Sequence, residues 1–409
     1  MLHTLPGFLA LSLLLGACGS EAQPRSAEPG DTGPLEQHVV SIAAGEQHSV
    51  AVLTDGSVWT WGLSGNGQLG REVTIDDYWL PRRVPGVNGA FAAAGGSSSF
   101  VYDGESLWTT GYNADGRLGW GPTRDEQRFS ARPHSRFVDL ESWGPTTYAL
   151  RSDSTVLAWG EGGSGQLGTG TTPLHQVDPV AVDLDKPVVA IAAGGAFAIV
   201  AHDDGTVSTW GHNVYGALGV PHVPNLQAAV TASGAASASS SASARKLFSE
   251  SPVQPQIGDV VGVAAGGSHA LVVRSDSTVW GWGSNEYGAL GHPDHDAILP
   301  EPVQIQGLSG VVAVAAGHTF SLALKADGSV WIWGFSPGPL SDGGAFERVR
   351  QVPRIAGITH IEAGQTHAFA VSSNGDLWGW GLADQGQVGS EESEGETDWP
   401  PLRVRFRTP

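Results

Sequence analysis

Histidines recur at one position of a repeated sequence pattern. His48, His269 and His367 each follow the glycine of a small-small-glycine segment by three residues. Imidazole is a frequent zinc ligand, so three recurring histidines could form a metal ring. Phenylalanine stands at two equivalent positions, Phe197 and Phe320, where no metal could be bound. The exchange with phenylalanine favours packed histidines whose ring nitrogens are satisfied by the backbone.

The densest group of metal-ligating residue types is a short polar segment around Pro293. It contains a mixture of imidazoles and carboxylates, namely His292, Asp294, His295 and Asp296. Such ligands suit several divalent metals. Because the segment is expected to be a surface loop, we favour an ordinary solvated turn and keep a metal site as the weaker alternative. We expect no organic cofactor.

The sequence contains no catalytic motif. There is no GxSxG nucleophile elbow and no GxxxxGK[ST] phosphate-binding loop, and no spacing of carboxylates indicates an acid–base pair. The many glycines fit tight turns instead. We therefore name no catalytic residue and expect a protein that binds rather than catalyses.

The net charge and the cysteine content exclude some functions. The formal charge of −20 disfavours nucleic acid, because affinity for phosphate backbones depends on Lys and Arg. Cys18 is the single cysteine, so the chain has neither an internal disulfide nor a cysteine-ligated metal site.

The amino terminus is typical of an exported bacterial lipoprotein. The apolar run from Phe8 to Leu15 is shorter than the roughly 20 residues needed to span a bilayer, and it suits a signal peptide. Leu15-Gly16-Ala17-Cys18 resembles a lipobox, which implies that residues 1–17 are removed and that Cys18 is lipidated. Residues 18–37 are then a disordered tether, rich in Pro, Gly, Ser and Glu. We expect a protein of the bacterial cell envelope, held to the membrane only by its lipid. Gly19 favours the outer membrane over the inner.

An internal repeat of about 50 residues fills the rest of the chain. The segments 42–70 and 263–291 align along their whole length without a gap. The copies share a glycine after an aromatic strand, at Gly62, Gly111, Gly160, Gly211, Gly283, Gly334 and Gly381. Each copy contains short strands and turns that cannot bury both faces alone. Seven copies therefore predict an all-β, seven-bladed propeller with four-stranded antiparallel blades.

Pairs of tryptophans predict how the blades pack. Trp59 and Trp61 lie two residues apart, as do Trp280 and Trp282, so each pair points to one face of its strand. Packing between blades explains such faces better than a platform for stacking ligands.

The repeat resembles the RCC1 family. Ala43-Ala44-Gly45-Glu46-Gln47-His48, an alternating strand, WxWG and GxLG carry the resemblance, which extends over about 39–409. It implies a seven-bladed propeller closed by the two chain ends. The last strand, 402–406, would pair beside the first strand, around 39–43, in a composite blade.

Three blades depart from the repeat. Ser98 replaces the histidine of blade two, Trp143-Gly144-Pro145 replaces the small-small-glycine segment of blade three, and Phe335-Ser336-Pro337-Gly338 replaces GxLG in blade six. We assign residues 38–409 to the propeller. Residues 221–252 form a low-complexity insertion between blades four and five, with a tract of Ala and Ser.

We expect a monomeric, exported binding scaffold that docks a protein or a ligand through loops on one propeller face. Aromatic and charged residues in loops are the candidate contacts, namely Tyr78, Trp79, Trp120 and Arg124, although burial would explain them equally well. The resemblance also implies guanine-nucleotide exchange activity as an alternative. An enzyme with its site at the mouth of the central channel is a second alternative.

Overall fold

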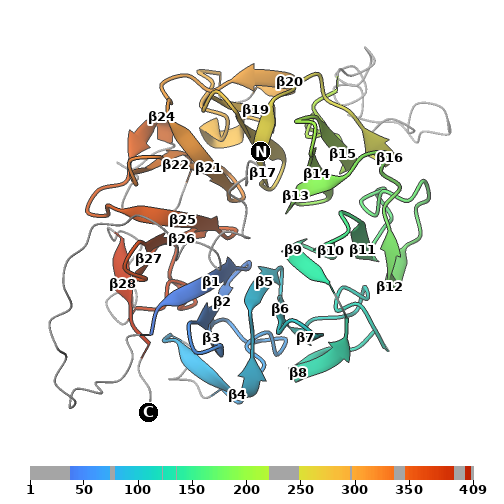
Figure 1. The fold of residues 1–409 in the computed structure, drawn as a ribbon, viewed down its shortest axis with the longest axis vertical. Helices are drawn as coiled ribbons and strands as arrows, with labels where there is room; N and C mark the ends of the chain where they lie inside the picture. Colours follow the sequence, from blue (N-terminus) through green and yellow to red (C-terminus); the bar gives the residue numbers. More distant parts are fainter. Residues whose placement is uncertain are drawn as a thin grey trace, which may run out of the picture.

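Seven small antiparallel sheets surround a central axis in the computed structural model (Figure 1). The structure describes residues 37–73, 79–121, 123–134, 136–220, 248–294, 297–335, 346–390 and 401–406. Each sheet contains four strands that follow one another in the sequence, so each repeat forms one complete blade. The predicted seven-bladed propeller is confirmed.

The strands of each blade run from the axis to the rim. The inner strands are β1 (Val39–Ala44), β5 (Phe91–Gly95), β9 (Phe137–Trp143), β13 (Val188–Ala193), β17 (Val260–Ala265), β21 (Val311–Ala316) and β25 (Ile358–Ala363). The second strands are β2 (His48–Leu53), β6 (Ser98–Tyr102), β10 (Thr146–Arg151), β14 (Phe197–His202), β18 (His269–Arg274), β22 (Phe320–Lys325) and β26 (His367–Ser372). The third strands are β3 (Ser57–Gly62), β7 (Ser106–Gly111), β11 (Val156–Glu161), β15 (Val207–His212), β19 (Val279–Ser284), β23 (Val330–Gly334) and β27 (Leu377–Gly381). The outer strands are β4 (Arg82–Asn88), β8 (Glu126–Pro133), β12 (His175–Ala181), β16 (Phe248–Val253), β20 (Ile298–Gln304), β24 (Phe346–Gln351) and β28 (Leu402–Val404).

The two faces of the ring carry connections of different length. Tight turns join the second and third strands on one face. In the first of them Gly56 adopts a φ of 79°, and the Asp55 carboxylate accepts a hydrogen bond of 2.9 Å from the Ser57 amide. The long connections to the outer strands leave from the opposite end, where the inner strands also end. We call this end the loop face. The 3₁₀ helix η2 (Glu286–Gly288) lies in one of its connections.

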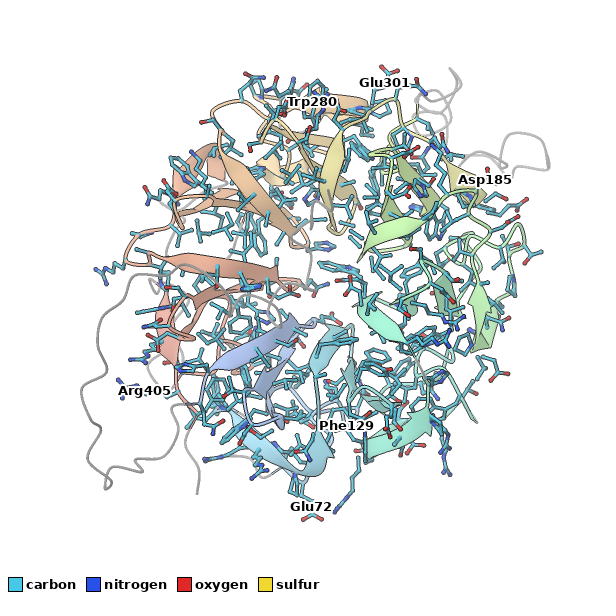
Figure 2. All side chains as sticks on the ribbon, in the orientation of Figure 1. Glu72, Phe129, Asp185, Trp280, Glu301 and Arg405 are labelled. Atoms are coloured by element: carbon cyan, nitrogen blue, oxygen red, sulfur yellow. The ribbon has the colours of Figure 1, made fainter. Side chains whose placement is uncertain are left out.

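The blades are sealed by large side chains on their third strands. Trp61, Trp159, Trp210, Trp282, Trp333 and Trp380 are fully buried. The Trp282 indole donates a hydrogen bond of 2.9 Å to the carbonyl of Ala217 on the preceding blade. Trp280, its partner two residues away, is half-buried and lies nearer the rim (Figure 2). The predicted packing of indoles between blades is confirmed for the second tryptophan of each pair.

The ring closes without a composite blade. The final strand β28 pairs with β27 of its own blade, and β1 pairs only with β2. The two end blades instead meet side by side, with the Phe406 ring 5.5 Å from that of Trp59. The closure implied by the family resemblance is therefore wrong for this chain. Each repeat already supplies four strands, so neither end lacks a strand that the other must provide.

The amino-terminal expectations fall on residues that the structure does not describe. The signal peptide, Cys18 and the tether up to residue 36 are among them. Among the described residues, no helix is long and apolar enough to cross a membrane. The insertion expected at residues 221–252 was assigned too far along the chain. Its last five residues belong to β16, which begins at Phe248 and forms the outer strand of blade four.

Candidate functional site

The recurring histidines lie between blades. The Nε2 atom of His48 is 2.9 Å from Ser99 Oγ on the next blade, and that hydroxyl donates to the Gln68 carbonyl at 2.6 Å. His269 and Ser321 are joined in the same way at 3.0 Å. These rings are buried, and burial lowers the pKa of His48 to about 4 and that of His269 to about 3. The packing of these histidines expected from the sequence is confirmed, but the ring nitrogen bonds a serine hydroxyl of the next blade and not the backbone.

These Ser–His pairs have the spacing of a nucleophile and its base, yet they are not placed for catalysis. His48 and Ser99 are both 0% exposed, so no substrate reaches the hydroxyl. In addition, the Nδ1 atom of His48 has no hydrogen-bond partner among the described residues, whereas a catalytic imidazole is oriented by a third group. The pairs fasten neighbouring blades together.

The segment that holds the weaker metal-site alternative is only partly described, since His295 and Asp296 lie outside the described residues. The Nδ1 atom of His292 accepts a hydrogen bond of 3.2 Å from the Asp294 amide. The carbonyls of both residues accept hydrogen bonds from the Asn285 side chain. These bonds belong to a local turn. Among the described residues, no group of three or more His, Cys, Asp and Glu has a metal-binding arrangement.

The described residues among the four proposed binding contacts differ in exposure. Trp120 is 8% exposed and packs in the core between blades two and three, under the guanidinium of Arg132 at 5.4 Å. The structure thus favours burial for Trp120. Trp79 is half-buried and Arg124 is exposed, while Tyr78 lies outside the described residues. A binding role for Trp79 and Arg124 stays a prediction.

Three carboxyl groups that the sequence reading missed lie at the ring axis. Asp139 and Glu141 belong to β9 of blade three, and Glu362 belongs to β25 of blade seven. These blades are not neighbours, but their inner strands both lie at the axis, and the negative charges of Asp139 and Glu362 raise the pKa of Glu141. We call these three groups the axial carboxyls.

The axial carboxyls resist ionisation. Each of the three residues is half-buried, and the surrounding blades remove most of the solvation of its carboxyl group. Burial raises the pKa of Asp139 to about 7 and that of Glu362 to about 8. Burial and the two neighbouring carboxylates raise the pKa of Glu141 well above its ordinary value. Clusters of this kind mark functional sites more often than structural ones.

A small cavity opens at the loop-face end of the axis. Its volume is about 50 Å³, and Trp143, Glu46 and Gln365 are among its lining residues. Trp143 is half-buried and follows Glu141 on the same side of β9. A larger cavity of about 610 Å³ lies between blades seven and one and borders His38, near the start of the described residues, and we assign no site to it.

Three exposed apolar side chains lie in the loops and strand ends on the loop face of blades four and five. Tyr215, Tyr287 and Ile298 are 43%, 45% and 45% exposed, and we call them the tyrosine patch. Ile298 lies beside Gly216, the residue that follows Tyr215, because a Cβ atom on Gly216 would come within 3.2 Å of the Ile298 side chain. Tyr287 lies in the adjoining turn and contacts the Phe335 ring at 5.3 Å.

Comparison of the repeats within the chain could have found both sites. Glu141 and Glu362 occupy a position that is alanine in the other five blades, at Ala43, Ala93, Ala192, Ala264 and Ala315. Tyr215 and Tyr287 occupy a turn position that is polar in other blades, at Asn66, Asp115, Ser164 and Gln385. In each case the signal is a residue that differs from the repeat, and the packing of the blade does not require that difference.

Family models match most of this chain. The model described as RCC1-like domain matches residues 90–408, and two models of the regulator of chromosome condensation (RCC1) repeat match residues 39–68 and 55–102. The E3 ubiquitin-protein ligase HERC2 of Homo sapiens is 32% identical over 208 residues, which cover 48% of this chain and 4% of that protein. The ultraviolet-B receptor UVR8 of Arabidopsis thaliana is 26% identical over 311 residues, which cover 73% of this chain and 65% of that protein. The chain thus spans less than about two thirds of either relative.

Solved structures of similar fold include human WBSCR16, with a TM-score of 0.71 and 21% identity over 86% of this chain and 94% of that one. Prp20p from Saccharomyces cerevisiae, described together with its binding to Gsp1p and histones, has a TM-score of 0.67 and 22% identity over 85% and 84% of the two chains. At these identities the likeness concerns the fold alone.

Proposed function

This chain belongs to the family of RCC1-like domains, and from that premise we propose that it is a binding propeller that docks a protein partner on its loop face. The tyrosine patch carries the proposal. Tyrosines and large apolar side chains form most binding hot spots, since they bury much surface at low conformational cost. Patches of this kind on soluble proteins often mark interaction sites.

The backbone of Tyr287 supports a functional role for that residue. Its φ is 56°, in the left-handed region that bulky side chains avoid at a cost of about 1 kcal/mol. The ring remains 45% exposed, so burial does not offset this cost. Residues held in unfavourable conformations occur preferentially at functional sites.

We also propose that the propeller is exported and anchored to a bacterial envelope membrane through a lipid on Cys18. The lipobox-like Leu15-Gly16-Ala17-Cys18 and the polar tether that follows it support this part of the proposal. A tether would present the ring in front of the membrane and leave the loop face free to bind.

The two alternatives have less support. Exchange activity rests on family analogy alone, and fold does not determine function. For an enzyme at the axis, the axial carboxyls with raised pKa values are the favouring observation. General acid–base catalysis also needs a group that positions the substrate. Among the described residues, the cavity at the loop-face end of the axis has a volume of only about 50 Å³, and none of the axial carboxyls lines it.

Site-specific photocrosslinking in intact cells tests the proposal. A photoreactive amino acid is placed at Tyr215 or Tyr287, and at Gln385 as the matched turn position on blade seven. We expect one discrete crosslinked protein at both tyrosine positions and little product at Gln385. The product at Tyr287 should also disappear when Tyr215→Ser is added. Equal products at all three positions, or none at the tyrosines, would contradict docking at the patch.

A further inference from the structure

Two exposed glutamates accompany the tyrosine patch. Glu286 directly precedes Tyr287 in η2, and Glu301 lies on β20, three residues after Ile298. On the premise of the docking proposed above, we infer that the protein partner presents a basic segment to this surface and places an arginine side chain over Tyr287 and beside Glu286.

Glu301 is brought close to the other tyrosine by the packing of blade four on blade five. Tyr215 precedes Gly216, where a Cβ atom would come within 2.8 Å of the Cα atom of Pro300. Glu301 follows Pro300 on β20 and lies at the outer edge of the ring (Figure 2). Each tyrosine of the patch therefore has a carboxylate nearby along the backbone, and a partner docked on the patch meets both.

The described part of blades four and five supplies no Lys or Arg to these carboxylates. Arg274 is the only such residue there, and it lies at the end of β18 away from the loop face. Its guanidinium is 2.8 Å from Asp259 and 3.6 Å from Asp276. Among the described residues, the carboxylates of Glu286 and Glu301 have no hydrogen-bond or ion-pair partner. Their negative charge is therefore available to a partner.

The tyrosine rings also lack the cation that other aromatic rings of the chain have. In four places a cationic group lies 4.1–5.7 Å from the centre of an aromatic ring, namely Arg117 over Tyr112, Arg132 over Trp120, Arg274 over Trp280 and Lys325 over Trp331. Among the described residues, no Lys or Arg lies over Tyr215 or Tyr287, and neither hydroxyl has a hydrogen-bond partner. The faces of both rings are therefore open to a cation from a partner.

Blade two shows how an arginine is held in the same turn of the repeat. Arg117 forms an ion pair with Asp115, and its Nε atom donates a hydrogen bond of 2.8 Å to that carboxylate. The guanidinium also lies over the ring of Tyr112 at 4.9 Å. A planar guanidinium can thus bond a carboxylate with its edge while its face covers an aromatic ring.

The turn of blade five contains the carboxylate and the ring but not the arginine. Glu286 and Tyr287 supply the first two groups, and Ala289 stands at the position of Arg117. Blade four also has an alanine at this position, Ala217, and both alanines are buried. A guanidinium beside Glu286 and Tyr287 would therefore have to come from another molecule or another part of the chain.

Ile298 makes the surface suitable for a long basic side chain. It is 45% exposed, and the aliphatic stem of an arginine packs on apolar surface while its charged head stays at the carboxylate. Opposite charges on the two partners would also speed their association and select against acidic proteins.

Ligand-observed NMR titrations of the full chain with a blocked Gly-Arg-Gly peptide test the inference. The matched probe has citrulline, the neutral isostere of arginine, at the central position. We expect the arginine peptide to bind at least about fivefold more tightly, because only the cation gains from the ring and the carboxylate. Its affinity should fall between about 0.1 M and about 1 M ionic strength, where the screening length shortens from about 10 Å to about 3 Å. Equal binding of the two peptides would overturn the inference.

Variants locate the arginine. Glu286→Gln and Tyr287→Asn should each weaken binding of the arginine peptide by about threefold or more and leave the citrulline peptide unchanged. Tyr287→Phe keeps the ring and should lose less than Tyr287→Asn. Glu105→Gln, an exposed glutamate in a tight turn of blade two, is the matched control and should bind as the wild type does. A full preference for arginine in both Glu286→Gln and Tyr287→Asn would refute the assignment.

Arg245 and Lys246 of the chain itself are tested as the other occupant. They belong to the low-complexity insertion and lie outside the described residues. The double variant Arg245→Gln/Lys246→Gln should bind the arginine peptide as the wild type does. Binding about fivefold tighter in this variant would show that the chain's own side chains fill the surface, which would rule out the external arginine.

Photocrosslinking separates the basic segment from the docking function on which it rests. A photoreactive residue at Tyr215 should give a weaker product when Glu286→Gln and Glu301→Gln are combined with it. An undiminished product would contradict the basic segment and leave docking at the patch in place. No product at Tyr215, together with a retained preference for the arginine peptide, would contradict protein docking while supporting an arginine-binding site.

Discussion

His48 on blade one and Ser99 on blade two are joined across the blade boundary by a hydrogen bond of 2.9 Å between Nε2 and Oγ. The same pairing of His with Ser recurs where blade five meets blade six and where blade seven meets blade one. Where the first residue is phenylalanine, the residue facing it is alanine, as in Phe197 with Ala270. At these boundaries the two facing residues are thus either both polar or both apolar.

This matching predicts a coupled response to mutation. His48→Phe alone should destabilise the fold by about 1–3 kcal/mol, because it removes a hydrogen bond in a buried contact. Ser99→Ala alone leaves the imidazole without a partner and should have a similar effect. The double variant recreates the Phe–Ala pair of other boundaries, so it should be more stable than the sum of the two single changes predicts. Urea unfolding of the four proteins measures the coupling. Strict additivity would contradict the pairing.

The second indole of each pair should contribute more than the first. Trp282 is 0% exposed and donates a hydrogen bond to the preceding blade. Trp282→Ala should therefore cost about 3–5 kcal/mol. Trp280→Ala is the control, since that half-buried indole lies over Arg274 at 5.7 Å and its loss should cost less. Equal melting temperatures for Trp282→Ala and the wild type would refute this packing.

The indole of Trp380 predicts a weaker contact between blades six and seven than between the other blades. Trp380 is 1% exposed, and its Nε1 atom has no hydrogen-bond partner among the described residues. The other buried indoles donate to the GxLG segment of the preceding blade, which blade six lacks. Trp380→Phe should therefore be nearly neutral, whereas Trp333→Phe removes a bond of 2.8 Å and should cost about 1 kcal/mol. Denaturant midpoints compare the two, and an equal loss in both would contradict the assignment.

The buried titratable groups predict a limited pH range of stability. The folded pKa of Glu362 is raised from 4.5 to about 8, so its favourable contribution is present below pH 4.5 and is lost as the pH rises through 8. Glu362→Gln should therefore melt at a higher temperature than the wild type above pH 8 and at a similar temperature below pH 4.5. Glu286→Gln should show no such divergence.

The buried histidines limit the stability of the fold at low pH. The pKa of His48 is lowered from 6.5 to about 4, so stability that is present above pH 6.5 is lost as the pH falls through 4.

A melting temperature of Glu362→Gln that followed the wild type at every pH would contradict the burial of its carboxyl group.

The fold could be predicted from the repeats, because every blade must satisfy the same packing requirements with the same residues. The glycines, the aspartate turns and the indoles each recur for a local reason. Glu141 and Glu362 have no such local reason, since each replaces the alanine that the other five blades carry at this position of the repeat. The predicted composite blade was wrong because residues 402–404 form the outer strand of their own blade. The sequence pattern fits either position, and only the observed strand pairing distinguishes the two.

The proposed lipid anchor predicts a change in fractionation. Cys18→Ser removes the thiol that the lipid would modify, so the protein should move from the membrane pellet into the soluble fraction. Ser20→Ala, two residues further along, is the control and should stay in the pellet. Pelleting of Cys18→Ser to the same extent as the wild type would count against lipidation.

The most direct test of the binding proposal compares affinity and stability in one variant. Tyr287→Asn carries the asparagine found at this turn position in blade one, and asparagine tolerates a φ of 56° better than tyrosine does. For the partner captured at this position, we expect the Kd to rise by at least about tenfold. The melting temperature should remain unchanged or increase. An unchanged Kd in a folded Tyr287→Asn protein would contradict docking at the loop face of blades four and five.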